Sequence, residues 1–256
     1  MCYVGKCLKK LAADQNNNQF PDELESNNSR ITNKLDIMKE LSKSFFPDPK
    51  PINKKQQEYI DEYLTYLSND KGPEPPPITN FELKNAVFSL KKNSAPGEDG
   101  IGIELIQVAY ETLEPVLSKL FNICLHISHY PLKWKVAKIT VLKKPNKETY
   151  KTPKSFRPIS VLNTLGKIFE KIIYERINWL SKENMWLKDN QHGFREGKGT
   201  ESAMHSLAQT IEGNLSKKEL TAVLFLDISG AVDCAWPFAI LAALAKRKCP
   251  GSDFII

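Results

Sequence analysis

The sequence contains no long apolar run and no closely paired cysteines. Its apolar segments stop short of the roughly 18 consecutive residues that a membrane-spanning helix needs, so we expect no membrane association. The 5 cysteines are scattered, and no two of them stand at the two-residue spacing of a zinc site or a redox pair. An odd, scattered set also argues against a disulfide framework. We therefore expect an intracellular protein that is not secreted.

Acidic residues are scarce in one part of the chain. The 256 residues carry 36 Lys or Arg and 30 Asp or Glu, a formal net charge of +6. Between Leu132 and Leu180, however, there are 12 Lys or Arg and 3 Glu, so this segment alone carries +9. Such a stripe suits a polyphosphate partner, because phosphate contacts supply most non-specific affinity for nucleic acid. The alternative is a solvated helix face, and charge alone fits both.

The sequence divides into four regions. Residues 1–40 are polar and rich in Asn, so we expect a flexible N-terminal region. Residues 41–78 are predicted to form a helical linker that ends in a proline-rich stretch. Residues 79–220 are the expected ordered core, and residues 221–256 are expected to hold a strand and the helix that follows it.

Local patterns predict a mixed α/β core. Thr79 and Glu82 form a capping box ahead of a helix with one apolar face. The Pro- and Gly-rich run at 93–100 cannot continue that helix and is expected to form a turn. Alternation predicts strands at 136–144 and 156–162, joined as a basic β-hairpin. We expect further helices at 35–45, at 56–67, from 101 to 130 with a break near Pro115, at 163–180 with Asn163 or Thr164 as its cap, and from Thr200 onward.

An acidic residue stands at the end of the most hydrophobic segment. The run Ala222–Leu226 is uninterrupted and apolar, which predicts a strand buried on both faces. Asp227 follows directly, and a carboxylate at such a place is normally paired or coordinates a metal. Mg²⁺ prefers hard oxygen ligands of this kind. The alternative is a helix N-cap, in which Asp227 accepts hydrogen bonds from the next turn.

Five short blocks follow one another along the chain. They are Ser-Ala-Pro-Gly-Glu-Asp-Gly at 94–100, a basic strand with a Lys-Pro-Asn-Lys end at 134–147, Phe-Arg-Pro-Ile-Ser at 156–160, Gln-His-Gly-Phe-Arg at 191–195, and Leu-Asp-Ile-Ser-Gly-Ala-Val-Asp at 226–233. Blocks of this kind, in this order, resemble the polymerase domain of non-LTR retrotransposon reverse transcriptases. The likeness implies a right-hand polymerase fold. It assigns the mostly helical fingers, with their basic β-hairpin, and the early palm to the core, and the first palm strand to the region after it.

The resemblance also implies a chemistry. The family synthesises DNA from deoxynucleotides on an RNA template and a DNA primer, with two Mg²⁺ ions. By that likeness Asp227 would bind both ions, and the backbone carbonyl of Ile228 would be a second ligand. Arg157 would reach the phosphates of the nucleotide, which a planar, permanently charged guanidinium suits. Its lysine partner would be Lys144 or Lys147, and an ordinary solvated lysine is the alternative for each.

Three further residues acquire expected roles from the same resemblance. Arg195 and Lys198 lie beside glycines and are candidates for template contact, with a plain basic turn as the alternative. Val232 stands where the family usually has Phe or Tyr, whose ring blocks the ribose 2′-hydroxyl. The smaller valine predicts weaker discrimination against ribonucleotides.

The 256 residues contain no Ala-Asp-Asp motif. A two-metal centre needs carboxylates that converge from separate strands, so we expect a polymerase fragment that is inactive alone. Two alternatives are a nucleic-acid-binding remnant without chemistry and a relative of group II intron maturases. A nuclear location follows from the resemblance only.

Overall fold

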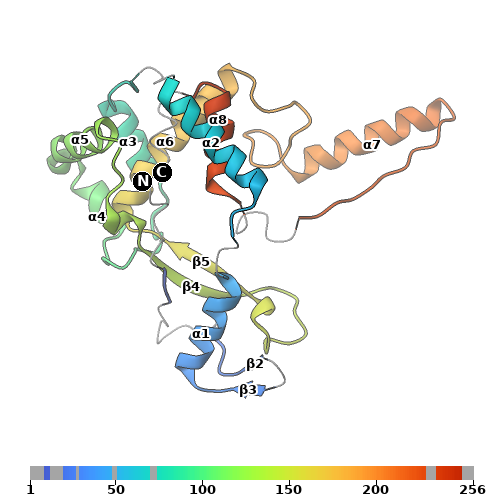
Figure 1. Cartoon of the computed structure of the whole chain (residues 1–256), viewed down its shortest axis with the longest axis horizontal. Helices are drawn as coiled ribbons and strands as arrows, with labels where there is room; N and C mark the ends of the chain where they lie inside the picture. The colour runs from blue at the N-terminus through green and yellow to red at the C-terminus, as the bar shows by residue number, and fades with distance from the viewer. Residues whose placement is uncertain are drawn as a thin grey trace.

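A computed structural model describes residues 9–11, 20–26, 29–47, 51–69, 74–228 and 235–249. Within them the chain is a mixed α/β protein, with most helices gathered at one end, a small sheet beside them, one helix on the far side of that sheet and another that projects outward (Figure 1). The helices are α1 (Lys34–Phe45), α2 (Lys54–Asn69), α3 (Asn80–Ser89), α4 (Ile103–Val108), α5 (Tyr110–His126), α6 (Thr164–Glu183), α7 (Thr200–Ser216) and α8 (Pro237–Lys246). The strands are β1 (Lys9–Leu11), β2 (Leu24–Ser26), β3 (Ser29–Ile31), β4 (Ala137–Lys143) and β5 (Phe156–Val161).

The main hydrophobic core lies between α3, α5 and α6. From α3 come Leu83 and Val87, both fully buried. Phe121 of α5 stacks on Phe169 of α6 with ring centroids 5.4 Å apart, and it meets Trp134 edge-on at 5.6 Å. Aromatic pairs in these geometries add to the stabilisation from apolar burial. The apolar stripes expected on α3 and α6 therefore do form the core.

Capping residues confirm two helix starts, whereas one expected break is misplaced. The Asn163 side chain accepts a hydrogen bond at the start of α6, and Thr79 forms its capping box at the start of α3. The break expected near Pro115 lies instead at Ala109, between α4 and α5. Pro115 lies inside α5, where it removes the backbone hydrogen bond to the Glu111 carbonyl without ending the helix.

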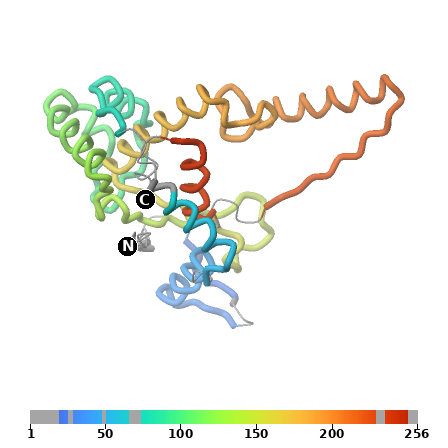
Figure 2. The backbone as a smooth tube through the Cα atoms, turned by 45° about the horizontal axis from the view of Figure 1, so that its top comes forward, coloured from blue at the N-terminus to red at the C-terminus, as the bar shows by residue number. Residues whose placement is uncertain are grey.

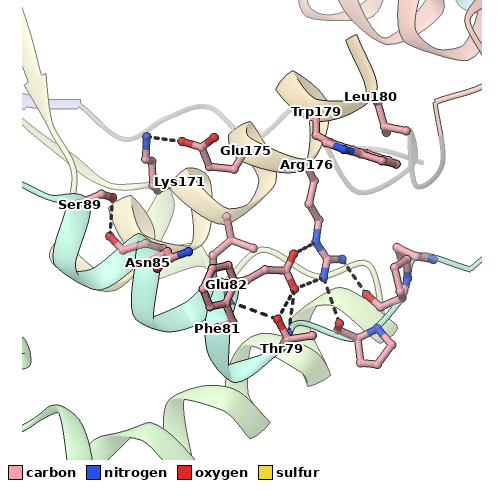
Figure 3. A pocket seen from close by; sticks show the side chains of 15 residues that line it. Thr79, Phe81, Glu82, Asn85, Ser89, Lys171, Glu175, Arg176, Trp179 and Leu180 are labelled. Atoms are coloured by element: carbon pink, nitrogen blue, oxygen red, sulfur yellow. Dashed lines mark hydrogen bonds and ion pairs between the residues drawn. The ribbon is translucent and has the colours of Figure 1, made fainter. Parts of the chain in front are cut away.

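An arginine of α6 fixes the start of α3. Arg176 donates to both carboxylate oxygens of Glu82, at 2.6 and 2.9 Å, and to the carbonyls of Pro76 and Pro77, at 2.7 and 3.1 Å (Figure 3). Burial raises the pKa of Glu82, but hydrogen bonds from Arg176 and Thr79 outweigh burial and leave that pKa below its ordinary value. The proline-rich stretch is thus fastened to the helical core.

The predicted basic hairpin is present. β4 and β5 pair antiparallel, with Val141 opposite Pro158 and Leu142 opposite Arg157. β1 pairs with β4 in parallel, which gives a three-stranded sheet in the order β1-β4-β5. One face of β4 is buried through Ile139 and Val141, and Arg157 lies on the opposite, exposed side of the hairpin.

The described residues between 20 and 40 are folded, in contrast to the flexible region expected for residues 1–40. β2 and β3 form a short antiparallel hairpin. Leu24 and Ile37 are buried in one cluster with Val141 and Phe156 of the sheet. Three-residue strands are too short to show a period of two in the sequence, which is why the pattern did not reveal them.

The second predicted helix is α2, and it pairs with α8. Tyr63 of α2 is buried in a cluster with Leu241, Ala242 and Ala245 of α8. Lys246 adds an ion pair to Glu62, with 3.0 Å between the ammonium and the carboxylate. Segments far apart in the sequence therefore join beside the helical end of the molecule (Figure 1).

The strand predicted at Ala222–Leu226 is wrong for this structure. After α7 projects from the body, residues 221–228 run back as an extended segment without strand pairing (Figure 2). Leu224 is 80 % and Leu226 84 % exposed, instead of buried on both faces. A strand requires neighbours that satisfy its backbone and cover its side chains. None of the described strands lies beside this segment.

Candidate nucleic-acid interface

Cations gather on the β4–β5 hairpin and on the connection between its strands. Between residues 137 and 161 they are accompanied by a single acidic residue, Glu148. The basic residues are Lys138, Lys143, Lys144, Lys147, Lys151, Lys154 and Arg157. Their density produces a local positive field of the kind that attracts polyphosphates.

Arg157 is presented outward by the pleat of the hairpin. It follows the fully buried Phe156 on β5, so its own side chain points to the opposite face. Within the described part of the chain its guanidinium makes no hydrogen bond or ion pair. The planar guanidinium is therefore available for bidentate contact with an anion such as phosphate.

The two candidate lysines differ in what they contact. Lys144 donates its ammonium to the carbonyl of Lys154 at 2.9 Å, and its own carbonyl accepts from the Tyr150 hydroxyl at 2.8 Å. Lys147 is exposed and has no hydrogen-bond or ion-pair partner among the described residues. Lys144 thus closes the connection between the strands, which favours Lys147 as the cation available to a ligand.

Two glutamates of the N-terminal segment anchor the same connection. The Lys151 ammonium lies 3.3 Å from the Glu25 carboxylate and 3.5 Å from that of Glu23. Hydrogen bonding to Glu25, with Glu23 close by, raises the pKa of Lys151. The amide of Glu25 also donates to the Lys151 carbonyl at 2.7 Å. Sequence reasoning missed these partners, because they lie more than a hundred positions away and belong to no motif.

Arg195 and Lys198 are engaged within their own loop. Arg195 donates to the Lys188 carbonyl at 2.8 Å, and its guanidinium lies 3.4 Å from the Asp189 carboxylate. Lys198 donates to the carbonyl of Asp189. Both also line a cavity of about 810 Å³ beside the exposed ring of Phe194. These contacts agree with the basic-turn alternative.

The candidate metal ligands lie at the end of the extended segment. Asp227 and Ile228 are both exposed, and Val232 falls outside the described residues. No group of three or more His, Cys, Asp or Glu in the described part of the chain could hold a metal ion. These residues alone therefore do not fit a two-ion centre, which needs several converging carboxylates.

Parts of the chain are similar to known proteins. Residues 142–256 match the family described as Reverse transcriptase (RNA-dependent DNA polymerase). The chain is 31 % identical over 170 residues to the probable RNA-directed DNA polymerase from transposon BS of Drosophila melanogaster, which covers 66 % of this chain and 19 % of that protein. This chain belongs to the reverse transcriptases of non-LTR retrotransposons.

Two further relatives carry similar names. The RNA-directed DNA polymerase from mobile element jockey of Drosophila melanogaster is 32 % identical over 182 residues, covering 70 % of this chain and 19 % of that protein. The retrovirus-related Pol polyprotein from type-1 retrotransposable element R1 of Bradysia coprophila is 30 % identical over 161 residues, covering 63 % and 16 %. The chain thus spans about a fifth of the length of these curated relatives.

The Pro- and Gly-rich turn at 93–100 lies against the junction of β5 and α6. A Cβ built on Gly97 would stand 2.6 Å from the Cα of Asn163, so only glycine permits this approach. The Lys167 ammonium donates to the Ala95 carbonyl at 2.6 Å, and its burial lowers the pKa of Lys167. The turn therefore braces the end of the basic hairpin.

A second cavity, of about 700 Å³, lies between α3, α6 and the proline-rich stretch (Figure 3). Phe81 and Trp179 give it apolar walls. Arg176 is engaged by Glu82, and Lys171 lies 2.6 Å from the Glu175 carboxylate. Because both cations are paired, this cavity is a poorer match for phosphate than the hairpin.

No helix within the described ranges of the chain combines the length and the apolar character needed to cross a bilayer.

Proposed function

We propose that this chain forms the fingers and the beginning of the palm of an RNA-directed DNA polymerase, and that its β4–β5 hairpin contacts the phosphates of nucleic acid and nucleotide. The observation that carries the proposal is the pair of exposed, unengaged cations Arg157 and Lys147 on one hairpin. Both lie in the region that matches the reverse transcriptase family. An anion bound there would replace solvent around two charges that no described residue neutralises.

The remaining site residues take their roles around this hairpin. Asp227 would supply one carboxylate and Ile228 one backbone carbonyl to Mg²⁺, and the other ligands would come from outside the described residues. Val232 would face the nucleotide sugar. Arg195 and Lys198 would contact the template only after exchanging their present contacts with Asp189.

Photocrosslinking tests where nucleic acid lies. An RNA template that carries 4-thiouridine would be annealed to a DNA primer, crosslinked to the chain and mapped by mass spectrometry. We expect crosslinked peptides between residues 137 and 161. Crosslinks confined to α5, on the other side of the helical core, would contradict the proposal.

Primer extension separates the polymerase fragment from a binding module that never performs chemistry. With deoxynucleotides and Mg²⁺, the 256-residue chain alone should extend no primer, because its described residues present one carboxylate at the candidate centre. Extension by the chain alone would overturn that expectation. The relatives named above support a retrotransposon polymerase over a group II intron maturase.

A further inference from the structure

The connection between β4 and β5, residues 144–155, carries Lys147 and depends on contacts outside the sheet for its order. Lys147 directly follows a turn in which Asn146 has a left-handed backbone, with φ of 58°. A free connection of this length has many backbone conformations, and a ligand that binds it must order it at the cost of conformational entropy. A contact that orders the connection beforehand therefore strengthens binding without touching the ligand.

An N-terminal brace, which consists of Glu23, β2, β3 and α1, packs against the hairpin. It lies on the side of β4 and β5 that faces away from the main group of helices (Figure 1). Leu24 is fully buried in a cluster with Val141 of β4 and Phe156 of β5. Tyr150 of the connection packs on the same cluster. A single apolar cluster thus joins the brace, both strands and the connection.

Two carboxylates of the brace hold the connection at Lys151. The Lys151 ammonium lies 3.3 Å from the Glu25 carboxylate and 3.5 Å from that of Glu23. The Glu25 amide also donates to the Lys151 carbonyl at 2.7 Å, and Glu23 pairs with Arg30 of β3. An exposed ion pair alone contributes little. Here, however, the buried Leu24 stands between the two glutamates and fixes the backbone that carries them.

We propose that Glu23 and Glu25 are positioning residues for nucleic-acid binding. By holding Lys151 they order the connection before a ligand arrives, which lowers the cost of bringing Lys147 to a phosphate. Lys151 is the tether in this arrangement and makes no phosphate contact of its own. The inference rests on the function proposed above for the β4–β5 hairpin.

The sign of the effect separates positioning from simple electrostatics. Glu23 and Glu25 are negative charges beside a cationic connection, so they repel phosphate. Their removal would by itself strengthen nucleic-acid binding. Removal would also strengthen binding if the glutamates competed with phosphate for Lys151. Positioning predicts the opposite, namely that binding weakens although the chain becomes more positive.

Binding of an RNA–DNA primer–template to the 256-residue chain, followed by fluorescence anisotropy at graded salt, tests this sign. The double substitution Glu23→Gln and Glu25→Gln should weaken binding by about threefold or more. The slope of log affinity against log salt should stay the same, because the phosphate contacts are unchanged. Binding that is stronger or unaltered in this variant would overturn the proposal.

Asp22→Asn is the matched control for the loss of a carboxylate. Asp22 is exposed beside Glu23, and its side chain has no hydrogen-bond or ion-pair partner among the described residues. Its substitution should leave binding unchanged or strengthen it slightly. If Asp22→Asn weakened binding as much as the double substitution does, the effect would not come from the contacts with Lys151, and the proposal would fail.

Substitutions of Lys151 distinguish a tether from a ligand contact. Lys151→Arg keeps a cation for both carboxylates and should retain the affinity. Lys151→Met should weaken binding by about threefold and leave the salt slope unchanged. A slope that falls by about one would show that Lys151 contacts a phosphate directly, which contradicts the proposal.

Amide hydrogen exchange of the free chain reports on the connection without nucleic acid. The double glutamate substitution should speed exchange at residues 146–150 and leave the amides of α3 and α6 as they are. Unaltered exchange at 146–150 would show that the brace does not order the connection. Failure of the proposed function is distinct from this result: Arg157→Ala with Lys147→Ala would then leave the salt slope unchanged.

Discussion

At the scale of single residues, Arg176 holds three parts of the chain together. Its guanidinium joins α6 to Glu82 of α3 and to the carbonyls of Pro76 and Pro77. The Arg176 side chain is 19 % and the Glu82 side chain 29 % exposed, so solvent screens the pair only partly. Replacement of the arginine would leave the carboxylate and two carbonyls without this donor.

We predict that Arg176→Gln lowers the free energy of unfolding by about 2 kcal/mol, measured by urea denaturation. Lys171→Gln is the matched control on the same helix, since Lys171 makes a more exposed ion pair with Glu175. It should cost about 0.5 kcal/mol or less. If the two substitutions lowered the free energy of unfolding equally, Arg176 would not be the residue that holds α3 and the proline-rich stretch to α6.

The same ion pair predicts a dependence of stability on pH. Folding lowers the pKa of Glu82, so the stabilisation is fully present above the unfolded-state pKa of about 4.3 and is lost as pH falls through the lower folded-state value. The stability difference between the unmodified chain and Glu82→Gln should therefore shrink on acidification below about pH 4. A difference that stays constant over that range would contradict the assignment.

The sequence could not predict which of the two candidate lysines is available to a ligand. Lys144 and Lys147 are chemically identical and stand in one motif, so their spacing does not distinguish their roles. The carbonyl of Lys154, brought close by the fold of the connection, distinguishes them. Arg157 was easier to place, because alternation along β5 already assigns its side chain to one face.

At the scale of elements, two glycines differ in how closely other atoms pack against them. Gly97 approaches the backbone of Asn163 too closely for a Cβ, whereas a Cβ on Gly213 of α7 would meet nothing within 4 Å. Gly97→Ala should lower the free energy of unfolding by about 2 kcal/mol through overpacking. Gly213→Ala should stabilise α7 by up to about 1 kcal/mol, because alanine is the better helix former.

Urea denaturation of Gly97→Ala and amide hydrogen exchange of α7 in Gly213→Ala measure these two effects. If both substitutions raised stability, or both lowered it, that result would contradict the close approach of the turn to α6.

Elements were predictable where local patterns decide them. Capping residues and one-sided apolar spacing gave α3 and α6 their starts and faces, and strand alternation gave the β4–β5 hairpin. The segment Ala222–Leu226 could not be placed in this way, because an apolar run specifies a strand only together with partners that cover it. The β2–β3 hairpin was not predicted, because it is stabilised by burial of Leu24 against residues that are distant in the sequence.

The whole molecule combines a packed body with a projecting arm, α7 and residues 217–228, that touches the body little. Amides of the arm should exchange hydrogen faster than those of α3, α5 and α6 in dilute solution, since few buried contacts protect it. Uniform protection along the chain would contradict this division.

Binding of an RNA–DNA primer–template at graded salt tests the central claim most directly, that the β4–β5 hairpin contacts nucleic acid. Each phosphate contact contributes close to one to the slope of log affinity against log salt. The double substitution Arg157→Ala and Lys147→Ala should therefore reduce the slope by about two. Lys119→Ala, which removes an exposed cation from α5, should leave it unchanged. An unchanged slope in the hairpin variant, or an equal loss in the Lys119 control, would contradict the account.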